Sequence, residues 1–309
     1  MIEASTLNVD AKRVNDYRDA AAAARYGASV TLRMDDLSTV PIDDVLDTVQ
    51  RRLDRRLALE AGRYSRVNGT AGFPTDAGTW VRLGWRRPGR LDAHAWTGYE
   101  ASQVLDERIP RPRWIATATW PDPVRDAVWR ADEMTLATTP VLSQTAEISD
   151  DPQLPTRWWG DLRTALDRLA AHATDRVTLG QAHLTARIQE VYGPLDTTIT
   201  DWAVAHGDLG YANLCGPDLT ILDWESWGRA PVGWDAAGLW MASLPVPHVA
   251  DRVADTFADV LATRSGQLTR LMLCANVTRA ARRTGRDVPR AMRTAADTLL
   301  QELDPRRFR

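Results

Sequence analysis

Apolar residues recur every three or four positions in several stretches of the chain, and this spacing predicts amphipathic helices. The clearest stretch follows Pro41 and has Asp43 and Asp44 in its first turn, where acidic side chains favour a helix N-terminus. Its apolar face comprises Ile42, Val45, Leu46, Val49, Leu53 and Leu57. The pattern predicts further helices over residues 10–26, 96–105, 158–173, 248–264, 268–283 and 288–303.

Shorter runs rich in β-branched and aromatic residues predict strands over residues 63–67, 79–86, 114–120 and 127–131. Between the first two, residues 68–78 include Gly69 and Gly72, and glycine lets backbone N–H groups approach a phosphate. This segment fits a nucleotide-covering loop and a surface hairpin equally well. Helical spacing resumes at about residue 135. The pattern therefore predicts an α+β chain with a helical leader over residues 1–60.

One polar stretch, residues 206–235, carries the candidate chemistry. It opens with His206, Gly207 and Asp208, and Asn213 and Asp223 follow. Residues 212–215 and 219–223 read as two strands around a Gly-bearing turn at 216–218, which predicts a hairpin. Because a hairpin brings its ends together, Asn213 and Asp223 should lie side by side, close to Asp208. Two carboxylates and an amide can orient a hydroxyl and hold Mg²⁺ against nucleotide phosphates.

This stretch resembles the aminoglycoside phosphotransferase and choline kinase group, the small-molecule branch of the protein-kinase-like fold. Members carry H-G-D-x-x-x-x-N, an apolar strand ending I-D-W-E, and another Asp twelve positions on. Here the strand ends Ile221-Leu222-Asp223-Trp224-Glu225, and Asp235 lies twelve positions after Asp223. The resemblance implies a bilobal fold. Residues 1–133 would form a nucleotide-binding lobe with an antiparallel sheet, and residues 134–309 a helical lobe with the catalytic loop and substrate site.

The resemblance also assigns roles to residues of this sequence. Asp208 corresponds to the catalytic base, and Asn213 and Asp223 correspond to the metal ligands. Asp235 corresponds to a structural residue that supports the catalytic loop, and His206 is expected to pack beneath that loop. The implied cofactor is Mg²⁺, with ATP or GTP as co-substrate.

The phosphate-contacting lysine of the family has no obvious counterpart, because Lys12 is the only lysine. Arg82, in the strand where that lysine is expected, is the candidate phosphate contact, and its guanidinium can form a bidentate fork. Glu100, on the following predicted helix, is its candidate partner. The alternatives are Arg86 and Arg87 for the cation and Glu107 for the carboxylate. Gly69 and Gly72 complete the candidate nucleotide-binding residues.

Composition narrows the class of protein. The chain is 44% hydrophobic and 26% charged, which is typical of a soluble globular protein, and its net charge of −3 gives no indication of a nucleic-acid or membrane partner. Two cysteines form neither a metal pattern nor a disulfide framework. The N-terminus lacks a signal peptide, and no stretch is long and apolar enough to span a bilayer. We expect a cytoplasmic protein, monomeric or homodimeric.

The leading hypothesis is an ATP- or GTP-dependent kinase that transfers the γ-phosphate to a hydroxyl of a small molecule. A cationic acceptor would suit the acidic residues Glu225, Asp251 and Asp255. Asp251, Asp255 and Asp259 are spaced by four, although a solvated helix face explains that stripe as well. The alternative is a catalytically inactive kinase-like protein that binds a nucleotide or ligand. The missing lysine and the segment Ala230-Pro231-Val232, where the family usually has G-D-P, motivate this alternative. The acceptor itself stays open, because specificity depends on the site and not on the fold.

Overall fold

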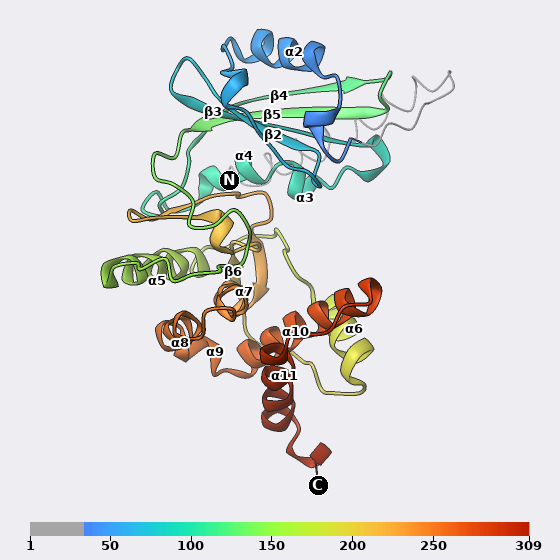
Figure 1. Ribbon diagram of the computed structural model, residues 1–309, viewed down its shortest axis with the longest axis vertical. Helices are drawn as coiled ribbons and strands as arrows, with labels where there is room; N and C mark the ends of the chain where they lie inside the picture. The colour runs from blue at the N-terminus through green and yellow to red at the C-terminus, as the bar shows by residue number, and fades with distance from the viewer. Residues whose placement is uncertain (1–33, 309) are drawn as a thin grey trace. The chain divides into compact units, whose positions relative to one another are not determined.

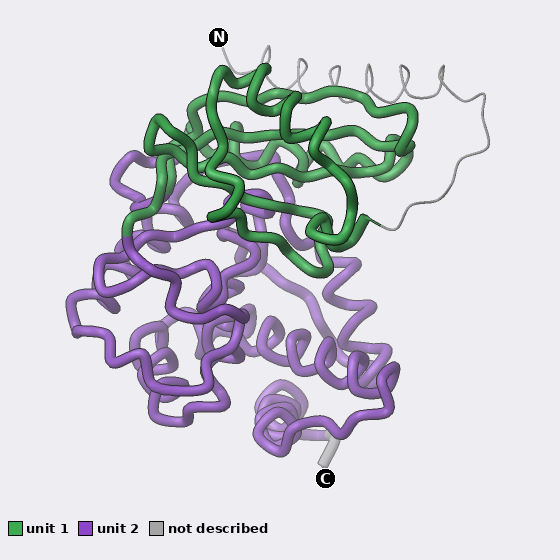
Figure 2. Tube along the Cα trace, turned by 45° about the horizontal axis from the view of Figure 1, so that its top comes forward, with its two compact units in different colours: residues 1–104, 112–138 green, residues 105–111, 139–309 purple. Residues whose placement is uncertain are grey.

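The computed structural model describes residues 34–308 of the chain, so the helix expected over residues 10–26 lies outside the described residues. The chain divides into two compact units, coloured separately in Figure 2. Unit 1 comprises residues 1–104 and 112–138, and unit 2 comprises residues 105–111 and 139–309. The change of unit after residue 138 lies five residues beyond the boundary expected from the sequence, because the last strand of unit 1 continues through Thr135.

Unit 1 contains a five-stranded antiparallel sheet in the order β1-β2-β3-β5-β4. Its strands are β1 (Arg63–Tyr64), β2 (Thr70–Pro74), β3 (Thr79–Arg86), β4 (Trp114–Asp122) and β5 (Ala127–Thr135). Strand β1 is shorter than the strand expected over residues 63–67. Part of the glycine-containing loop expected over residues 68–78 is strand β2. The reason is Phe73, whose fully buried side chain places residues 70–74 in the sheet. Only residues 65–69 remain as the connection from β1 to β2.

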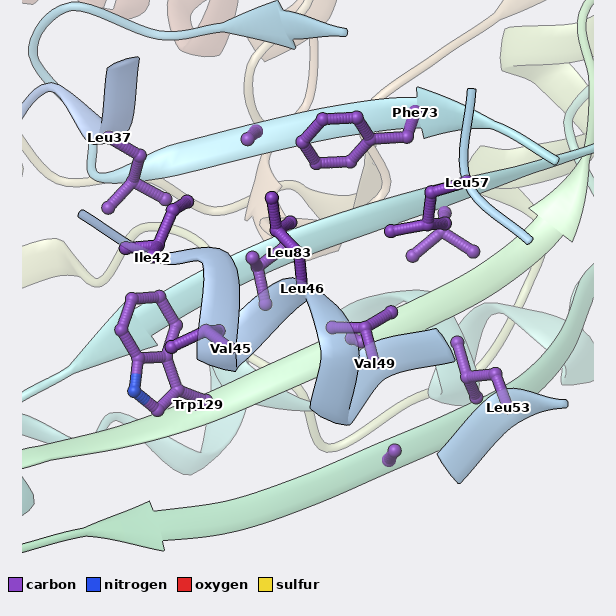
Figure 3. Packing of buried hydrophobic residues seen from close by; sticks show 14 of the residues in the cluster. Leu37, Ile42, Val45, Leu46, Val49, Leu53, Leu57, Phe73, Leu83 and Trp129 are labelled. Carbon is purple, nitrogen blue, oxygen red and sulfur yellow. The ribbon is translucent and has the colours of Figure 1, made fainter. Parts of the chain in front are cut away.

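Helix α2 (Asp43–Leu53) covers one face of this sheet, as the apolar spacing after Pro41 predicts. Val45, Leu46, Val49 and Leu53 are buried in one cluster with Leu83 and Trp129 of the sheet (Figure 3). The helix ends at Asp54, which adopts a left-handed conformation with φ 54°. Arg55 then turns inward, and its Nε lies 2.7 Å from Oε1 of the buried Glu133 in β5. Apolar packing and a partly buried ion pair therefore hold α2 against the sheet.

The remaining elements of unit 1 are short. They are the 3-10 helices at Leu37–Thr39, Leu59–Ala61, Pro88–Arg90 and Ser102–Val104, and the helices α3 (Ala93–Trp96) and α4 (Gly98–Ala101). The single helix expected over residues 96–105 is wrong: Thr97, with φ −108° and ψ 8°, interrupts it just before Gly98. The prediction of a helical leader over residues 1–60 is also wrong in part, because much of its described portion is not α-helix. Within residues 34–60, α2 is the α-helix, and irregular chain and 3-10 turns make up the rest.

Unit 2 is mainly helical (Figure 1). Its helices are α5 (Thr156–Ala170), α6 (Gln181–Tyr192), α7 (Trp234–Ser243), α8 (Pro247–Thr256), α9 (Ala258–Leu261), α10 (Arg264–Thr284) and α11 (Arg290–Leu303), with 3-10 turns at Tyr211–Asn213 and Pro305–Phe308. Two antiparallel strand pairs complete it: β6 (Trp202–Ala205) with β9 (Gly228–Pro231), and β7 (Leu214–Cys215) with β8 (Thr220–Ile221). The helix expected over 248–264 is two helices, because the chain breaks at Phe257.

The α+β fold class is thus confirmed, with the sheet in unit 1 and the longer helices gathered in unit 2. Across the part of the chain that the structure describes, no helix combines the length and the hydropathy that crossing a membrane requires.

Candidate functional site

The predicted hairpin is present in unit 2. Leu214 pairs with Ile221 and Cys215 with Thr220, and the amide of Leu222 donates to the carbonyl of Asn213 at 2.8 Å. The strands are shorter than expected, because Asn213 belongs to the 3-10 turn that precedes β7. Even so, the ladder places Asn213 opposite Leu222, the residue before Asp223. The hairpin therefore brings the backbone of Asn213 close to that of Asp223.

His206 connects the loop that carries Asp208 to the end of this hairpin. Its ring is fully buried, and the Asp208 amide lies 3.4 Å from Nδ1 while Nε2 lies 2.7 Å from the carbonyl oxygen of Leu222. A carbonyl can only accept and an amide N–H can only donate, so these contacts define the neutral tautomer with the proton on Nε2. The ring also packs edge-on against Trp224 at 4.8 Å between centroids. The His206 ring therefore links the backbone of the loop at Asp208 to the backbone of the hairpin at Leu222.

Asp235 supports the same loop from the first turn of α7. One carboxylate oxygen accepts from the His206 amide at 2.7 Å and the other from the Gly207 amide at 3.0 Å. Trp234 Nε1 donates to the Gly207 carbonyl at 3.0 Å, so both sides of this glycine are bonded. Burial raises the pKa of Asp235, while the two amide bonds act in the opposite direction. These bonds hold the backbone of residues 206 and 207, and the supporting role that the resemblance implies stays a prediction.

Gly207 has no room for a side chain. Its φ is +94°, and a Cβ there would lie 2.6 Å from the carbonyl oxygen of Ser226 and 2.8 Å from Thr178 Cγ2. We expect Gly207→Ala to reduce the free energy of unfolding by more than about 3 kcal/mol, since backbone strain and overpacking each cost about 1–3 kcal/mol. Chemical denaturation measures the loss.

Gly193→Ala is the matched control, because Gly193 also has a positive φ, +76°, but a Cβ there would meet no atom within 4 Å. This variant should lose only the strain contribution, about 1–3 kcal/mol. Equal losses for the two variants would show that the close approach to Ser226 contributes nothing.

Asp208 and Asp223 interact electrostatically. The pKa of Asp208 is raised above its usual value, first because surrounding protein desolvates the carboxylate and second because Asp223 is a nearby negative charge. Although Asp208 is exposed at the surface, atoms crowd it on the protein side. Asn213 opposes both effects through a hydrogen bond to the Asp208 side chain, and its Nδ2 donates to the Asp208 carbonyl at 2.8 Å. Two like charges in partial desolvation form a site that favours a cation.

Asp223 has an unusual backbone conformation for a residue with a side chain, with φ +59°. The turn that imposes it is closed by Trp224, whose Nε1 donates to the Ile221 carbonyl at 2.7 Å and whose side chain is 1% exposed. Asp and Asn tolerate this region better than other non-glycine residues. Backbone strain of this kind occurs often at functional sites, so the conformation supports a site at Asp223 without identifying it.

Arg176 stabilises the chain that follows Asp223. Its guanidinium stacks on Trp227 at 4.7 Å, and it donates to the Trp227 carbonyl at 3.1 Å and to the Glu225 carbonyl at 3.3 Å. Arg176 was not predicted from the sequence. In the sequence Arg176 is only a polar residue in an irregular segment, so nothing there indicates a role near Asp223.

The donor atoms at the hairpin suit Mg²⁺. Because the amide nitrogen of Asn213 is bonded to Asp208, the amide oxygen is the atom available to a metal, and Asp223 supplies a carboxylate. Within residues 34–308, no group of three or more His, Cys, Asp or Glu side chains is arranged as a metal site. Mg²⁺ commonly needs only one or two carboxylates, because water and nucleotide phosphates supply its other ligands. The residues present therefore fit this ion together with a nucleotide.

Unit 1 contains a second charged cluster, on the sheet face opposite α2. Arg82 lies on β3, and its guanidinium carbon is 5.1 Å from the ring centroid of Tyr99 in α4. The neighbouring Glu100 forms an ion pair with Arg130 of β5 at 3.1 Å. Arg130, which donates to Glu100, was not among the residues selected from the sequence. The available signal was a pair of charged residues, Arg130 and Asp132, at alternate positions of a strand that is buried through Met134.

The two glycines selected as nucleotide contacts have packing roles. A Cβ at Gly69 would lie 2.3 Å from Trp85 Nε1, and one at Gly72 would lie 2.2 Å from Trp80 Cζ2. Gly72 is inside β2, paired with Arg63 and Arg82, and is not part of a flexible loop. Gly69, with φ +62°, ends the β1–β2 connection. A phosphate contact stays a prediction for both, and packing alone accounts for glycine at each position.

The expected acidic stripe does not lie on one helix. Asp251 and Asp255 are on α8, whereas Asp259 follows the break at Phe257 and belongs to α9. Asp259 accepts two hydrogen bonds from Arg163, at 2.6 and 2.7 Å, and the pKa of its carboxyl is lowered mainly by that bond. Asp259 is therefore a structural ion-pair partner. A substrate role for Asp251, Asp255 and Glu225 stays a prediction.

The chain has a kinase-like fold, as its similarity to a solved aminoglycoside phosphotransferase shows. One similar structure is that of a thermostable mutant of aminoglycoside phosphotransferase APH(4)-Ia in its apo form. The TM-score is 0.51 and the sequence identity 11%, and the match covers 83% of this chain and 98% of that one. No family model and no curated protein matches the sequence.

Two ligand-bound structures are also similar at lower scores. The GDP and kanamycin complex of APH(2")-IIia has a TM-score of 0.45 and 12% identity, covering 76% of this chain and 89% of that one. The amicoumacin kinase hAmiN, in complex with AMP-PNP, Ca²⁺ and Ami, has a TM-score of 0.43 and 10% identity, covering 87% and 95%. At these identities the likeness concerns the fold, and the residues of the site must support any function.

Proposed function

We propose that the protein is an ATP- or GTP-dependent phosphotransferase that uses a hydroxyl group of a small molecule as acceptor. The observation that carries the proposal is the arrangement around His206. A buried imidazole and a buried carboxylate, Asp235, fix the loop of Asp208 against the hairpin end that presents Asn213 and Asp223. Folding stability alone does not explain several carboxylates at one loop, because their mutual repulsion and their desolvation cost free energy.

In this proposal Asp208 orients the acceptor hydroxyl and receives its proton as the hydroxyl oxygen bonds to the γ-phosphorus. The bond from that phosphorus to the bridging oxygen breaks, and the nucleoside diphosphate leaves. Asn213 and Asp223 would hold Mg²⁺, which when bound supplies charge neutralisation at the phosphates. His206 and Asp235 act as positioning residues. Arg82, with Glu100 as its candidate partner, would contact the phosphates in place of lysine.

The proposed acceptor class is an amine-bearing small molecule with free hydroxyl groups. Glu225, Asp251 and Asp255 would suit a cationic acceptor, and the structure with a TM-score of 0.51 is by its name an aminoglycoside phosphotransferase. The inactive alternative rests on the single-lysine composition. Against it, the altered segment Ala230-Pro231-Val232 does not disturb the support of the loop, because Asp235 still accepts from both amides.

A nucleotide-consumption assay tests the proposal. The protein is incubated with Mg²⁺, ATP or GTP and a panel of amine-bearing and neutral polyols, and ³¹P NMR identifies any phosphate ester. We expect ester formation that depends on an acceptor and on Mg²⁺. The Asp208→Asn protein is the matched control. Nucleotide binding without consumption across the panel would favour the inactive alternative.

A further inference from the structure

The charged cluster on the sheet of unit 1 contains more groups than one cation–carboxylate pair. Arg130 donates from Nε to both oxygens of Asp132, at 3.0 and 2.8 Å, and from a terminal nitrogen to Asp132 at 2.8 Å and Glu100 at 3.1 Å. The side chains of Arg130 and Asp132 are 8% and 3% exposed. Trp114 Nε1 donates to the same Asp132 carboxylate at 3.1 Å. Arg130 is therefore committed to protein partners.

Strand register places Arg82 beside this group. In the antiparallel pairing of β3 with β5, Arg82 is opposite Asp132 and Gly84 is opposite Arg130. Directly opposed residues share a face of the sheet, so both arginines lie on the face away from α2. A Cβ at Gly84 would lie 3.5 Å from a terminal nitrogen of Arg82, which shows that the Arg82 side chain extends over this glycine. The absence of a side chain at Gly84 leaves room for two guanidinium groups on neighbouring strands.

The charges of this group do not balance internally. Arg130 contributes one positive charge, and Asp132 and Glu100 contribute two negative charges. A buried ion pair gives little net stability relative to apolar residues of similar size, because desolvation offsets the attraction. Stability alone therefore does not explain why β5 carries Arg130 and Asp132. The net negative charge of these three side chains favours a further cation on the same face, and the half-buried Arg82 extends over Gly84 on that face.

We propose that Arg130 and Asp132 are positioning residues for the phosphate contact, an inference that rests on the proposed function. Asp132 fixes the guanidinium of Arg130, and Arg130 fixes the carboxylate of Glu100. Glu100, on α4 next to Tyr99, then sets the position of Arg82 over the Tyr99 ring. In this proposal Arg130 is held by Asp132 and Glu100, and Arg82 is the residue that contacts phosphate. Arg130 therefore orients Glu100, and Arg82 binds the phosphate.

A charge-neutral double substitution tests this division. Arg130→Met with Asp132→Leu removes both buried charges together, so that neither remains unpaired and the fold is retained. We expect the Kd for Mg²⁺ with AMP-PNP, measured by calorimetry, to rise about 10-fold or more, as for loss of a charged hydrogen bond. In turnover, the nucleotide KM should rise while kcat changes by less than about threefold. The control is Arg125→Met with Asp122→Leu, which removes another ion pair of the same unit. An unchanged Kd, or a change equal to the control's, would overturn the inference.

Coupling to Glu100 separates positioning from a general structural effect. Glu100→Gln alone should also weaken AMP-PNP binding, but added to the double variant it should have little further effect, because the chain from Arg130 to Glu100 is already broken. Additive losses would contradict the inference. If the double variant does not fold, Arg130→Lys replaces it: lysine cannot make the planar fork, so an intermediate Kd is expected, and a wild-type Kd would overturn the inference.

These binding measurements need no turnover, so they remain informative if the protein transfers no phosphate. Failure of the proposed function would appear as absent ester formation with intact coupling among Arg130, Asp132 and Glu100. Failure of the inference would appear as active protein without that coupling.

Discussion

Asp208→Asn is expected to reduce turnover by about 10²–10⁴-fold, the usual contribution of a general base. Asparagine keeps the size of the side chain and its hydrogen bond to Asn213 but cannot accept the hydroxyl proton. AMP-PNP affinity should stay close to that of the wild type, since Asp208 is not proposed as a metal ligand. Turnover close to the wild-type value, measured with any acceptor that supports ester formation, would refute the catalytic role.

The same variant should be more stable than the wild type. The pKa of Asp208 is raised in the folded chain by desolvation and by Asp223, so the folded state binds its proton more readily than the unfolded state does. The folded state therefore loses stability as pH rises through the interval between the ordinary and the raised pKa. Below both values the carboxyl group is neutral in both states and this cost disappears.

Thermal unfolding at two pH values measures this cost. Asp208→Asn should raise Tm at neutral pH, and the gain should be smaller near the ordinary carboxyl pKa of about 4. A gain that is the same at both pH values would mean that the charge of Asp208 is not the cause. The acid limb of a turnover profile should likewise lie above the pH expected for an unperturbed aspartate.

Asp223→Asn is expected to abolish the Mg²⁺-dependent part of nucleotide affinity. Residues that merely support metal ligands contribute about 10–100-fold to metal affinity, so loss of a ligand carboxylate should cost at least about 100-fold. Asparagine is chosen because φ is +59° at this position and Asn adopts that region readily, so the backbone is preserved. AMP-PNP titration with Mg²⁺ and with EDTA measures the effect.

Asp126→Asn is the matched control for this variant. Asp126 also has a positive φ, +49°, and lies in the turn between β4 and β5 of unit 1, outside the hairpin. It should bind AMP-PNP as the wild type does in both conditions. If Asp223→Asn retained a full response to Mg²⁺, the metal-ligand assignment would be wrong and the hairpin would need another explanation.

Elements governed by a single periodicity or motif are the ones that the sequence predicts best. The spacing from Val45 to Leu53 predicts α2 because one face of that helix is buried and the other is not. The hairpin is predictable because its turn and motif residues are local. By contrast α7 was missed: it is buried around most of its circumference, so apolar residues occur without a helical period.

Other differences come from contacts between residues far apart in sequence. Glycine at positions 69 and 72 suggested a phosphate loop, but the size constraint comes from Trp85 and Trp80, which lie opposite only after the strands have paired. The partner of Glu100 could not be chosen from spacing either, because Arg130 reaches it across the sheet. Local signals therefore predicted the hairpin better than the contacts across the sheet.

The attachment of α2 has a practical consequence for shortened versions of this protein. Removing everything before β1 would uncover the apolar surface around Leu83 and Trp129 and would leave the Glu133 carboxylate in the interior without Arg55. Such a truncation should aggregate during expression, even though the sheet itself would be intact. Truncations intended for crystallisation should accordingly begin upstream of residue 34, because the helix is an integral layer of the first unit and cannot be treated as an appendage.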